Sequence, residues 1–358
     1  MAMAEPESTS KIIHPYITHP GSRYGLSSPV QYPTDCIRTL RSRPFCFSAR
    51  SCNKWALGRV ILAGDAAHVF PPFGGQGIAS GFRDASSLAW RLAILSCNPH
   101  SADHDRVLAA WYAERKQQLE RSLAATIQNG AYVTESDPWK AFVRDWYLWA
   151  IQLVPGWKRD LEKGPRKDGM IRYQYQSGMP FLSQYGGGVC FPQVYCTGLD
   201  GAQNAGRVAF TDDLIFAPLK EGLCQVVVLV DRVDEVGPAV STLTGLSQLS
   251  QGLVREDEAT IFVHDFTAKL PADAKVEVGK TARLARIATG PEFAADVRLC
   301  TNRPAPRYYD AYRMKHEVHG KKFVIVRPDR FVYAACSNME ELQRAAKSMP
   351  QALTISTS

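Results

Sequence analysis

The sequence has no Cys-x-x-C pair, no Cys/His cluster with zinc spacing and no apolar run of 18 residues or more. Nothing therefore signals a redox dithiol or a metal site, and no segment is long enough to cross a bilayer. Residues 1–21 also lack the apolar stretch of a secretory signal peptide. The cysteines number nine, an odd count that favours free thiols in a reducing compartment, so we expect a cytoplasmic protein.

The composition is otherwise that of an ordinary globular protein, with 45% hydrophobic and 22% charged residues among 358. This length is more than one hydrophobic core usually serves, so we expect two domains. The net charge is +7, but Lys and Arg are scattered along the chain rather than gathered in a block. The charge weakly favours an anionic ligand such as a dinucleotide, and it gives little support for nucleic-acid binding.

The first part of the chain changes from irregular to periodic. Residues 1–44 show little periodicity and are expected to be largely irregular. Phe45, Phe47 and Ala49 alternate with polar neighbours, which predicts a half-buried strand, and the apolar run Arg59–Ala63 predicts a buried one. Apolar residues at helical spacing then predict two helices, near residues 85–95 and 105–127. The tryptophans that follow, which we expect in a core or an interface, are Trp139, Trp146, Trp149 and Trp157.

Residues 164–212 are rich in Gly, Pro and Gln and are predicted to form an extended connection. Strands and helices alternate again beyond it, which predicts a small α/β domain. The expected strands are Val226–Val230, Thr260–Val263 and a hairpin of Phe323–Val326 with Phe331–Ala334, turned at Pro328 and Asp329. The expected helices are 239–253, Tyr308–Lys315 and a last one that begins at Ser337, with Glu340 completing a capping box.

The segment Gly58–Leu95 has the clearest chemical meaning. A predicted strand ends in Gly64-Asp65, a loop with paired prolines follows, and Gly74-Gly75-Gln76-Gly77 opens a helix. Ligands dock at the carboxyl ends of strands in α/β sheets, where an Asp can accept hydrogen bonds from ligand hydroxyls. Glycines let backbone N–H groups approach a flat ring closely, and the start of a helix favours negative charge there.

This segment resembles the second FAD fingerprint of the class A flavoprotein monooxygenases, the family that contains the p-hydroxybenzoate and phenol hydroxylases. The resemblance covers more than thirty positions and includes Gly-Asp-Ala-Ala-His (64–68) and Gly-Gly-Gln-Gly (74–77). Ala79 departs from it, because many members carry Asn at this position. Trp-Tyr-Ala-Glu-Arg (111–115) resembles the Y-x-x-E-R that follows the fingerprint helix.

The resemblance implies an FAD site. Asp65 is then expected to bind the ribityl chain, and the backbone of the glycine loop to surround the isoalloxazine. The residues assigned to the cofactor in this way are Gly64, Asp65, Pro72, Gly74, Gly75, Gln76, Gly77 and Ile78. The side chains of His68 and Asp84 are expected to be structural, and no catalytic residue is assigned.

Looser matches extend the resemblance to residues 45–350. Pro192-Gln193, Thr211–Leu214 and Val326–Val332 resemble landmarks of phenol-hydroxylase-like members, whose C-terminal domain is thioredoxin-like. The implied fold class is α/β (α+β), a remnant of the Rossmann-like FAD-binding domain followed by a thioredoxin-like domain. The expected parts are an irregular remnant (1–44), a partial FAD-binding domain (45–163), the connection (164–212) and the thioredoxin-like domain (213–350).

Members of the family begin with a strand, turn and helix bearing G-x-G-x-x-G, which binds the pyrophosphate of FAD, and this motif does not occur here. We therefore expect a truncated FAD-dependent monooxygenase-type protein that hydroxylates a phenolic substrate with NAD(P)H and O₂. The alternative is a non-catalytic scaffold, forming a homodimer through its C-terminal domain, with a vestigial flavin loop. A thioredoxin-like redox function is weak, because the cysteines of that domain are isolated.

Overall fold

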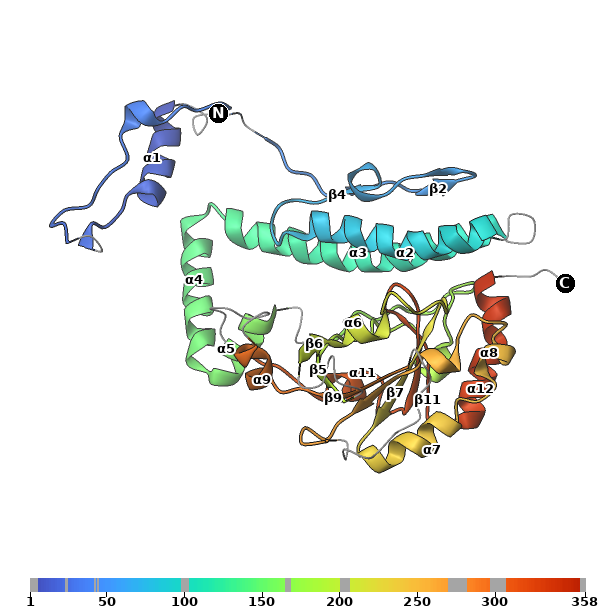
Figure 1. Ribbon diagram of the computed structural model, residues 1–358. Coiled ribbons are helices and arrows are strands. Elements are labelled where there is room, and N and C mark those ends of the chain that lie inside the picture. Colours follow the sequence, from blue (N-terminus) through green and yellow to red (C-terminus); the bar gives the residue numbers. More distant parts are fainter. Residues whose placement is uncertain are drawn as a thin grey trace. The chain divides into compact units, whose positions relative to one another are not determined.

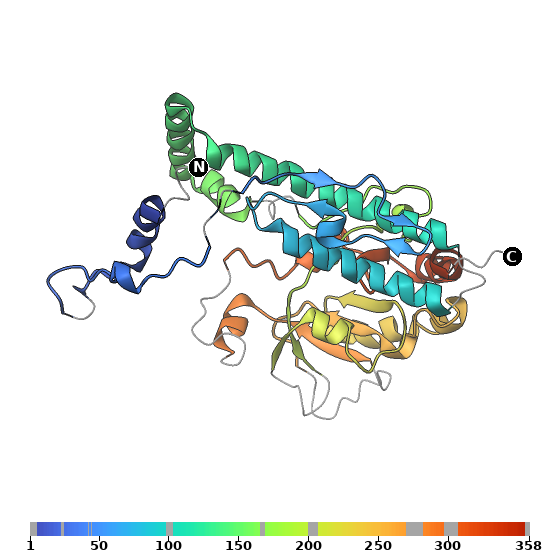
Figure 2. The ribbon, with the colours of Figure 1, turned by 90° about the horizontal axis from the view of Figure 1, so that it is seen from above.

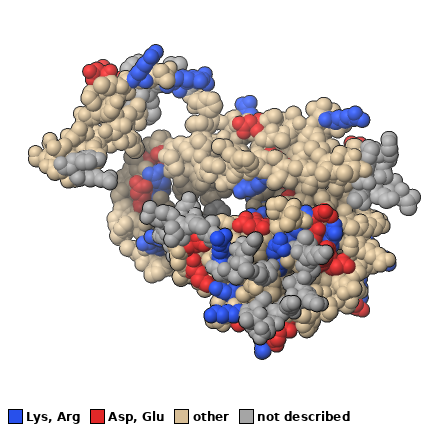
Figure 3. Space-filling model, viewed as in Figure 1, with Lys and Arg blue, Asp and Glu red and all other residues tan. Residues whose placement is uncertain are grey.

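The computed structural model describes residues 6–22, 25–41, 43, 45–97, 103–164, 169–199, 207–269, 282–296 and 307–354. The chain divides into two compact units, Met1–Ala49 and Arg50–Ser358. No helix in these ranges is long and apolar enough to cross a membrane. On the face that Figure 3 shows, Lys and Arg are interspersed with Asp and Glu, which agrees with the scattered charges of the sequence.

The first unit contains helix α1 (Pro6–Ile17) and a 3-10 turn, η3 (Thr34–Cys36). The helix differs from the expectation of a largely irregular segment. The strand predicted from Phe45 and Phe47 is wrong, because the described residues 45–49 pair with no other strand. Both rings are consequently exposed, by 66% and 54%.

Two long helices, α2 (Gln76–Cys97) and α3 (His104–Thr134), lie side by side in the second unit (Figures 1 and 2). Their presence confirms the helices predicted near 85–95 and 105–127. Asp103 caps α3 by accepting a hydrogen bond of 3.0 Å from the backbone N–H of Arg106. The apolar faces of both helices form one core with Trp55, through Leu88, Leu95, Val107, Leu108, Trp111 and Leu119.

Four two-residue strands precede α2. They form two antiparallel pairs, β1 (Arg50–Ser51) with β4 (His68–Val69) and β2 (Ala56–Leu57) with β3 (Val60–Ile61). The strand predicted at Arg59–Ala63 is present only at Val60–Ile61, and the prediction that it is buried is wrong. Within the described residues β3 pairs with β2 alone, so Val60 remains 68% exposed.

Helices α4 (Pro138–Leu153) and α5 (Pro155–Lys163) follow α3, and neither contains a buried residue. In Figure 1, α4 turns away from the end of α3. The four tryptophans of this stretch are exposed by 53–77%, so they are not part of a core within the described chain.

A seven-stranded sheet organises the rest of the second unit, in the order β11-β10-β7-β8-β9-β5-β6. The central strands β7, β8 and β9 are parallel, and the outer pairs are antiparallel. Two buried clusters cover its two faces. The strands are β5 (Tyr195–Gly198), β6 (Val208–Phe210), β7 (Gln225–Val230), β8 (Thr260–Val263), β9 (Arg283–Ile287), β10 (Phe323–Val326) and β11 (Val332–Cys336).

Short helices connect the strands, and α12 (Met339–Met349) lies against β11 (Figure 1). The others are α6 (Thr211–Ile215), α7 (Val236–Ser241), α8 (Leu246–Leu249), α9 (Gly290–Ala295) and α11 (Arg313–Glu317). The remaining turns are 3-10 turns η4 (Gly64–Ala66), η6 (Ser183–Tyr185), η7 (Val233–Glu235) and η8 (Glu256–Glu258), and a π-helical turn, η9 (Pro350–Thr354).

The structure confirms the mixed α/β class and the predicted strands β7, β8 and β10–β11. The parallel β7–β8 unit with α7 and α8 between its strands, and the β10–β11 hairpin followed by α12, are the halves expected of a thioredoxin-like domain. The segment 164–212 differs from a plain connection, because it adds β5 and β6 to the sheet. The domain boundaries stay a prediction.

Three helix predictions need correction. The helix expected at 239–253 is broken between α7 and α8, where Gly245 has a positive φ of 84°. The helix expected from Tyr308 begins only at Arg313, because Tyr308 itself has a positive φ of 61°. The cap of α12 is Asn338 rather than Ser337, and its side chain accepts from the N–H of Glu341 rather than that of Glu340.

Candidate functional site

The predicted cofactor residues lie on two neighbouring elements of the second unit. Gly64 and Asp65 form turn η4, whereas Gln76, Gly77 and Ile78 form the first turn of α2, with Pro72, Gly74 and Gly75 in the loop before it. The turn lies directly on the helix, since a Cβ added to Gly81 would be 3.7 Å from the Cα of Gly64. The structure thus brings the two halves of the fingerprint together.

A buried carboxylate holds these two halves in place. Asp84 is fully buried on α2, and its Oδ2 accepts hydrogen bonds from the N–H of Gly64 at 3.0 Å and from His68 Nε2 at 2.7 Å. Its Oδ1 accepts from Nε of Arg115 at 2.8 Å. Burial raises the pKa of Asp84, but the hydrogen bond from His68 and the charge of Arg115 outweigh it, so the net pKa is lowered.

The same contacts define the state of His68. An ionised carboxylate can only accept, so His68 carries its proton on Nε2 and donates it to Asp84. The ring is 2% exposed and lies 5.0 Å from the ring of Trp55. These contacts tie the turn that carries Asp65 to α2, which is compatible with the structural role expected for His68 and Asp84.

The glycine loop leaves open space where a flat ligand would lie. Gly64, Gly74 and Gly75 have positive φ values of 58°, 114° and 63°, conformations that favour glycine. A Cβ added to Gly64 or Gly75 would meet no atom within 4 Å. The first turn of α2 follows at once and presents backbone N–H groups with the positive end of the helix dipole.

The loop is anchored from α3 as well. The ring of Phe73 lies so close to Gly130 that a Cβ there would be 2.7 Å from its Cδ2. On the other side, the Gln76 side chain donates to the carbonyl of Gly74 at 3.2 Å and accepts from Arg83 at 3.4 Å. The loop conformation therefore depends on residues of both long helices.

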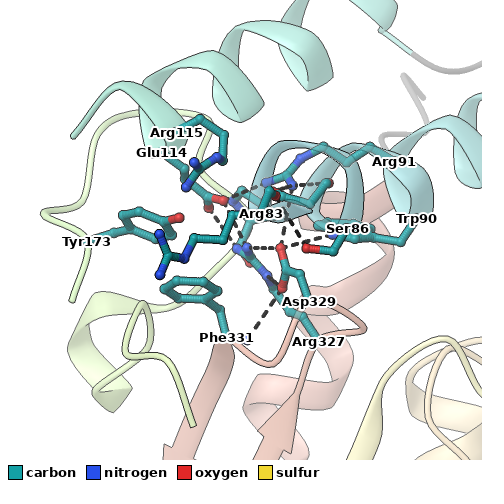
Figure 4. Close-up of polar contacts among 12 residues, drawn as sticks. Arg83, Ser86, Trp90, Arg91, Glu114, Arg115, Tyr173, Arg327, Asp329 and Phe331 are labelled. Carbon is teal, nitrogen blue, oxygen red and sulfur yellow. Dashed lines mark hydrogen bonds and ion pairs between the residues drawn. The ribbon is translucent and has the colours of Figure 1, made fainter. Parts of the chain in front are cut away.

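A second buried network joins these helices to the hairpin β10–β11 (Figure 4). Glu114 accepts hydrogen bonds from Arg91 at 2.7 Å and from both terminal nitrogens of Arg327, at 2.7 and 2.8 Å. Asp329 accepts from Nε and Nη2 of Arg327 at 3.0 and 2.7 Å, and from the Trp90 indole at 3.0 Å. The side chains of these four charged residues are at most 2% exposed.

The charges of this network balance, because two guanidinium groups face two carboxylates. Burial lowers the pKa of Arg91, while the charges of Asp329 and Glu114 hold that of Arg327 above its usual value despite burial. Burial alone would raise the pKa of Asp329, but the charge and hydrogen bonds of Arg327 have a larger effect. The net pKa of Asp329 is therefore lowered. Glu114 and Arg115 are neighbours on α3. Glu114 binds Arg327 of the hairpin, whereas Arg115 binds Asp84, which holds the turn η4 against α2.

Sequence patterns predict little of this network. They mark Glu114 and Arg115 only through the resemblance at 111–115, and Asp329 only as part of a turn. Nothing local marks Arg91 and Arg327 as partners of Glu114, because the pairing with Arg327 spans 213 positions.

A groove of about 1230 Å³ lies elsewhere, between α5 and the segment 307–317. Its lining includes Arg159, Lys163, Tyr308, Tyr312 and Glu317, and none of the eight predicted cofactor residues. The described part of the chain holds no cluster of three or more His, Cys, Asp or Glu residues suited to a metal ion.

Comparisons with known proteins agree with the fingerprint. Residues 30–125 match the family model described as an FAD binding domain. A 3-(3-hydroxy-phenyl)propionate/3-hydroxycinnamic acid hydroxylase of Burkholderia cenocepacia (strain HI2424) is 32% identical over 157 residues, 44% of this chain and 26% of the relative. A second such hydroxylase, of Burkholderia vietnamiensis, is 28% identical over 337 residues, 93% of this chain and 51% of the relative.

The chain thus spans about half the length, or less, of the curated relatives that it matches. Among solved structures, OxyS anhydrotetracycline hydroxylase from Streptomyces rimosus has a TM-score of 0.49 at 19% identity, over 86% of this chain and 46% of that one. A ternary complex of aklavinone-11 hydroxylase with FAD and aklavinone has a TM-score of 0.47 at 18% identity, over the same shares.

Proposed function

Because the chain belongs to the class A flavoprotein monooxygenases, the FAD-dependent aromatic hydroxylases, we propose that its glycine loop forms the flavin side of an FAD site. The carboxylate of Asp65 would accept hydrogen bonds from the ribityl hydroxyls, beside the backbone of Gly64. The isoalloxazine would lie along Pro72, Gly74 and Gly75 and at the start of α2, formed by Gln76, Gly77 and Ile78.

The observation that carries this proposal is the clamp around Asp84. It ties turn η4 to α2, so the ribityl-binding carboxylate and the helix N-terminus are held at a fixed relative position. The space beside Gly64 and Gly75 fits the approach of a flat ring, since a Cβ at either glycine would point into it. The residues present therefore fit the flavin and ribityl parts of the cofactor.

When bound, FAD supplies the chemistry, by accepting a hydride from NAD(P)H and transferring one oxygen atom of O₂ to an activated ring. The residues of this chain orient it. The N–H groups and dipole at the start of α2 would stabilise negative charge that develops on a flavin bound there. His68 and Asp84 keep Asp65 in position and exchange no proton with substrate, because both are buried against each other.

The substrate we propose is a phenol, by analogy with the relatives named hydroxylases of 3-(3-hydroxy-phenyl)propionate and 3-hydroxycinnamic acid. No residue of this chain is assigned to substrate or to NAD(P)H. A reducing compartment, the cytoplasm, is part of the proposal, since the eight cysteines in the described ranges are all free thiols.

A non-catalytic scaffold is the second candidate. One observation favours it, because the surroundings of Asp65 are open to solvent. Nearby in the sequence, Val60 is 68% exposed and Ile78 is 79% exposed. Flavin contacts made from one side only would bind weakly, and flavin would then have no bearing on the role of the chain.

The direct test is to incubate the purified chain with FAD, record the visible spectrum at saturation, and follow NAD(P)H oxidation with 3-(3-hydroxyphenyl)propionate. The proposal predicts a perturbed flavin spectrum. Asp65→Ala should raise the FAD concentration needed to produce it about tenfold, as expected when a hydrogen bond to a charged group is lost. Asp160→Ala, a change at an exposed Asp on α5, should leave that concentration unchanged. Substrate-dependent NAD(P)H oxidation with a hydroxylated product supports the enzyme. A folded chain that never perturbs the flavin spectrum contradicts the FAD site and favours the scaffold.

A further inference from the structure

Helix α4 directs its aromatic face outward. The face consists of Trp139, Phe142, Val143, Trp146, Tyr147, Trp149 and Leu153, and each of these side chains is exposed by 53–77%. Half-buried positions lie on the opposite side of the helix, at Ala141, Arg144, Leu148 and Ile151. The helix therefore turns a face of mixed aliphatic and polar residues toward the protein and its aromatic face to solvent, whereas an ordinary amphipathic helix exposes its polar face.

The spacing on this face is that of a helix-pairing seam. Trp139, Phe142, Trp146, Trp149 and Leu153 follow one another at intervals of three, four, three and four residues. This is the a and d pattern of two heptads, in which every position of the seam is a large apolar side chain. Successive rings already touch along the helix, with centroids 6.2, 6.3 and 5.1 Å apart. Such a seam is complementary to a second helix of the same kind.

The arm that carries the seam begins with a capped helix and is anchored at its far end. Asp137 caps α4, because its Oδ1 accepts from the N–H groups of Trp139 and Lys140 at 2.9 and 3.1 Å. At the far end, Glu162 of α5 accepts a 2.5 Å hydrogen bond from the hydroxyl of Tyr308. The guanidinium of Arg159 lies 5.3 Å from the centroid of the Tyr308 ring. The aromatic face is thus presented by an anchored pair of helices.

The exposed area is large enough for a stable interface. An aromatic side chain buries about 150–250 Å² when it is fully covered. The five aromatic residues of the face are exposed by 53–77%, so covering them would bury about 600 Å². Val143 and Leu153 add to this, and a standard specific interface buries about 800 Å² per partner.

The charges around the seam favour a protein partner over a bilayer. Helices that lie on membranes carry a polar face rich in Lys and Arg. The charged residues of α4 are Lys140, Arg144 and Asp145, and the Arg144 Nε donates to Asp145 at 2.8 Å. In α5, Lys158, Arg159 and Lys163 are mixed with Asp160 and Glu162. The two helices together carry five basic and three acidic side chains, so their net charge is only +2, which gives little attraction to anionic lipid.

We propose that α4 pairs with α4 of a second copy of this chain, so that the aromatic face is the core of a two-fold homodimer interface. A seam of two heptads is self-complementary under a two-fold axis, and such dimers are the commonest soluble assemblies. This interface lies outside the segment 213–350, through which the family resemblance predicts dimerisation. In the described parts of that segment, the exposed large apolar side chains are few and come from separate stretches: Leu219, Tyr308, Tyr312 and Met339.

Sedimentation velocity of the full chain from 0.5 to 50 µM tests the proposal. The wild-type chain should be a dimer at the upper end, and Trp146→Glu/Trp149→Glu should be a monomer throughout. Leu219→Glu, a change at an apolar side chain that is 70% exposed elsewhere, should dimerise like the wild type. Tryptophan emission adds a second measurement, since dilution of the wild type should shift it to longer wavelength and dilution of the double variant should not.

Circular dichroism and thermal melts check that the variants fold. If the double variant does not fold, Tyr147→Lys at the rim of the same face should raise the dimer dissociation constant at least tenfold with an unchanged melt. A wild type that remains monomeric at 50 µM overturns the proposal, as does a folded double variant that dimerises normally. Wild-type monomers that float with phosphatidylcholine/phosphatidylserine vesicles overturn it in favour of a bilayer.

Discussion

Replacing Glu114 with glutamine removes one negative charge from a site that holds two buried guanidinium groups. The Glu114 carboxylate makes three hydrogen bonds of 2.7–2.8 Å to Arg91 and Arg327. The amide keeps the shape of the side chain, but its oxygen can serve one guanidinium and its NH₂ faces the other. Asp329 alone then balances two cations, which leaves one buried positive charge without compensation.

Breaking a buried ion pair by removing one partner costs about 3–5 kcal/mol. A whole protein is commonly stable by only about 5–15 kcal/mol, so Glu114→Gln should remove a large share of the free energy of unfolding. Urea denaturation followed by circular dichroism measures it. The control is Glu120→Gln on the same helix, where the carboxylate is 64% exposed and lies 3.8 Å from Lys116. This change should cost less than about 1 kcal/mol.

The pairing itself is tested with Arg327→Met. If Glu114 and Arg327 act as one unit, the double variant should lose less unfolding free energy than the two single variants lose in sum. Each single change leaves a buried charge without its partner, and the second change removes that charge. A Glu114→Gln variant within about 1 kcal/mol of the wild type would refute the argument, because it would mean that water or a shift of the hairpin compensates the charge.

Further predictions concern pH and the loop. Burial and then the charge of Lys315 lower the pKa of His264 to about 4 from an unfolded value near 6.5, so only the unfolded state gains this proton as the pH falls. The free energy of unfolding should therefore fall between pH 6.5 and 4, and His264→Gln should flatten that part of the urea-denaturation profile. Gly130→Ala should displace Phe73 and raise the FAD dissociation constant about tenfold in a fluorescence titration, because the new Cβ would lie 2.7 Å from the ring. Gly156→Ala meets no atom within 4 Å, so it should leave FAD binding unchanged and raise the thermal midpoint slightly.

The spacing of apolar residues predicted the elements whose apolar residues keep one period along the whole element. The helical spacing of Leu88, Leu92 and Leu95 predicted α2, and the apolar run 226–230 predicted the fully buried strand β7. The same reasoning failed at 239–253, because the apolar spacing continues across Gly245 while the backbone there turns left-handed. It also missed β9, whose sequence Arg-Leu-Ala-Arg-Ile contains two charged residues.

The candidate site shows the same division. The fingerprint predicted which residues gather at the start of α2, since they lie within about thirty positions of each other. It did not predict the buried pairing of Glu114 with Arg327, because an ion pair between residues 213 positions apart produces no recurring pattern in the sequence. The aromatic face of α4 was expected in a core or an interface, and the structure excludes the core within the described chain.

Equilibrium dialysis of the chain against riboflavin and against FAD tests the central claim most directly. The proposed site contacts only the flavin and ribityl parts, which both ligands share. Their dissociation constants should therefore lie within about threefold of each other, a difference of about 0.7 kcal/mol in binding free energy. Asp65→Ala should weaken both about tenfold, as expected when a hydrogen bond to a charged group is lost. Binding of neither ligand to the folded chain, or binding that Asp65→Ala leaves unchanged, would contradict the assignment of the glycine loop to the flavin.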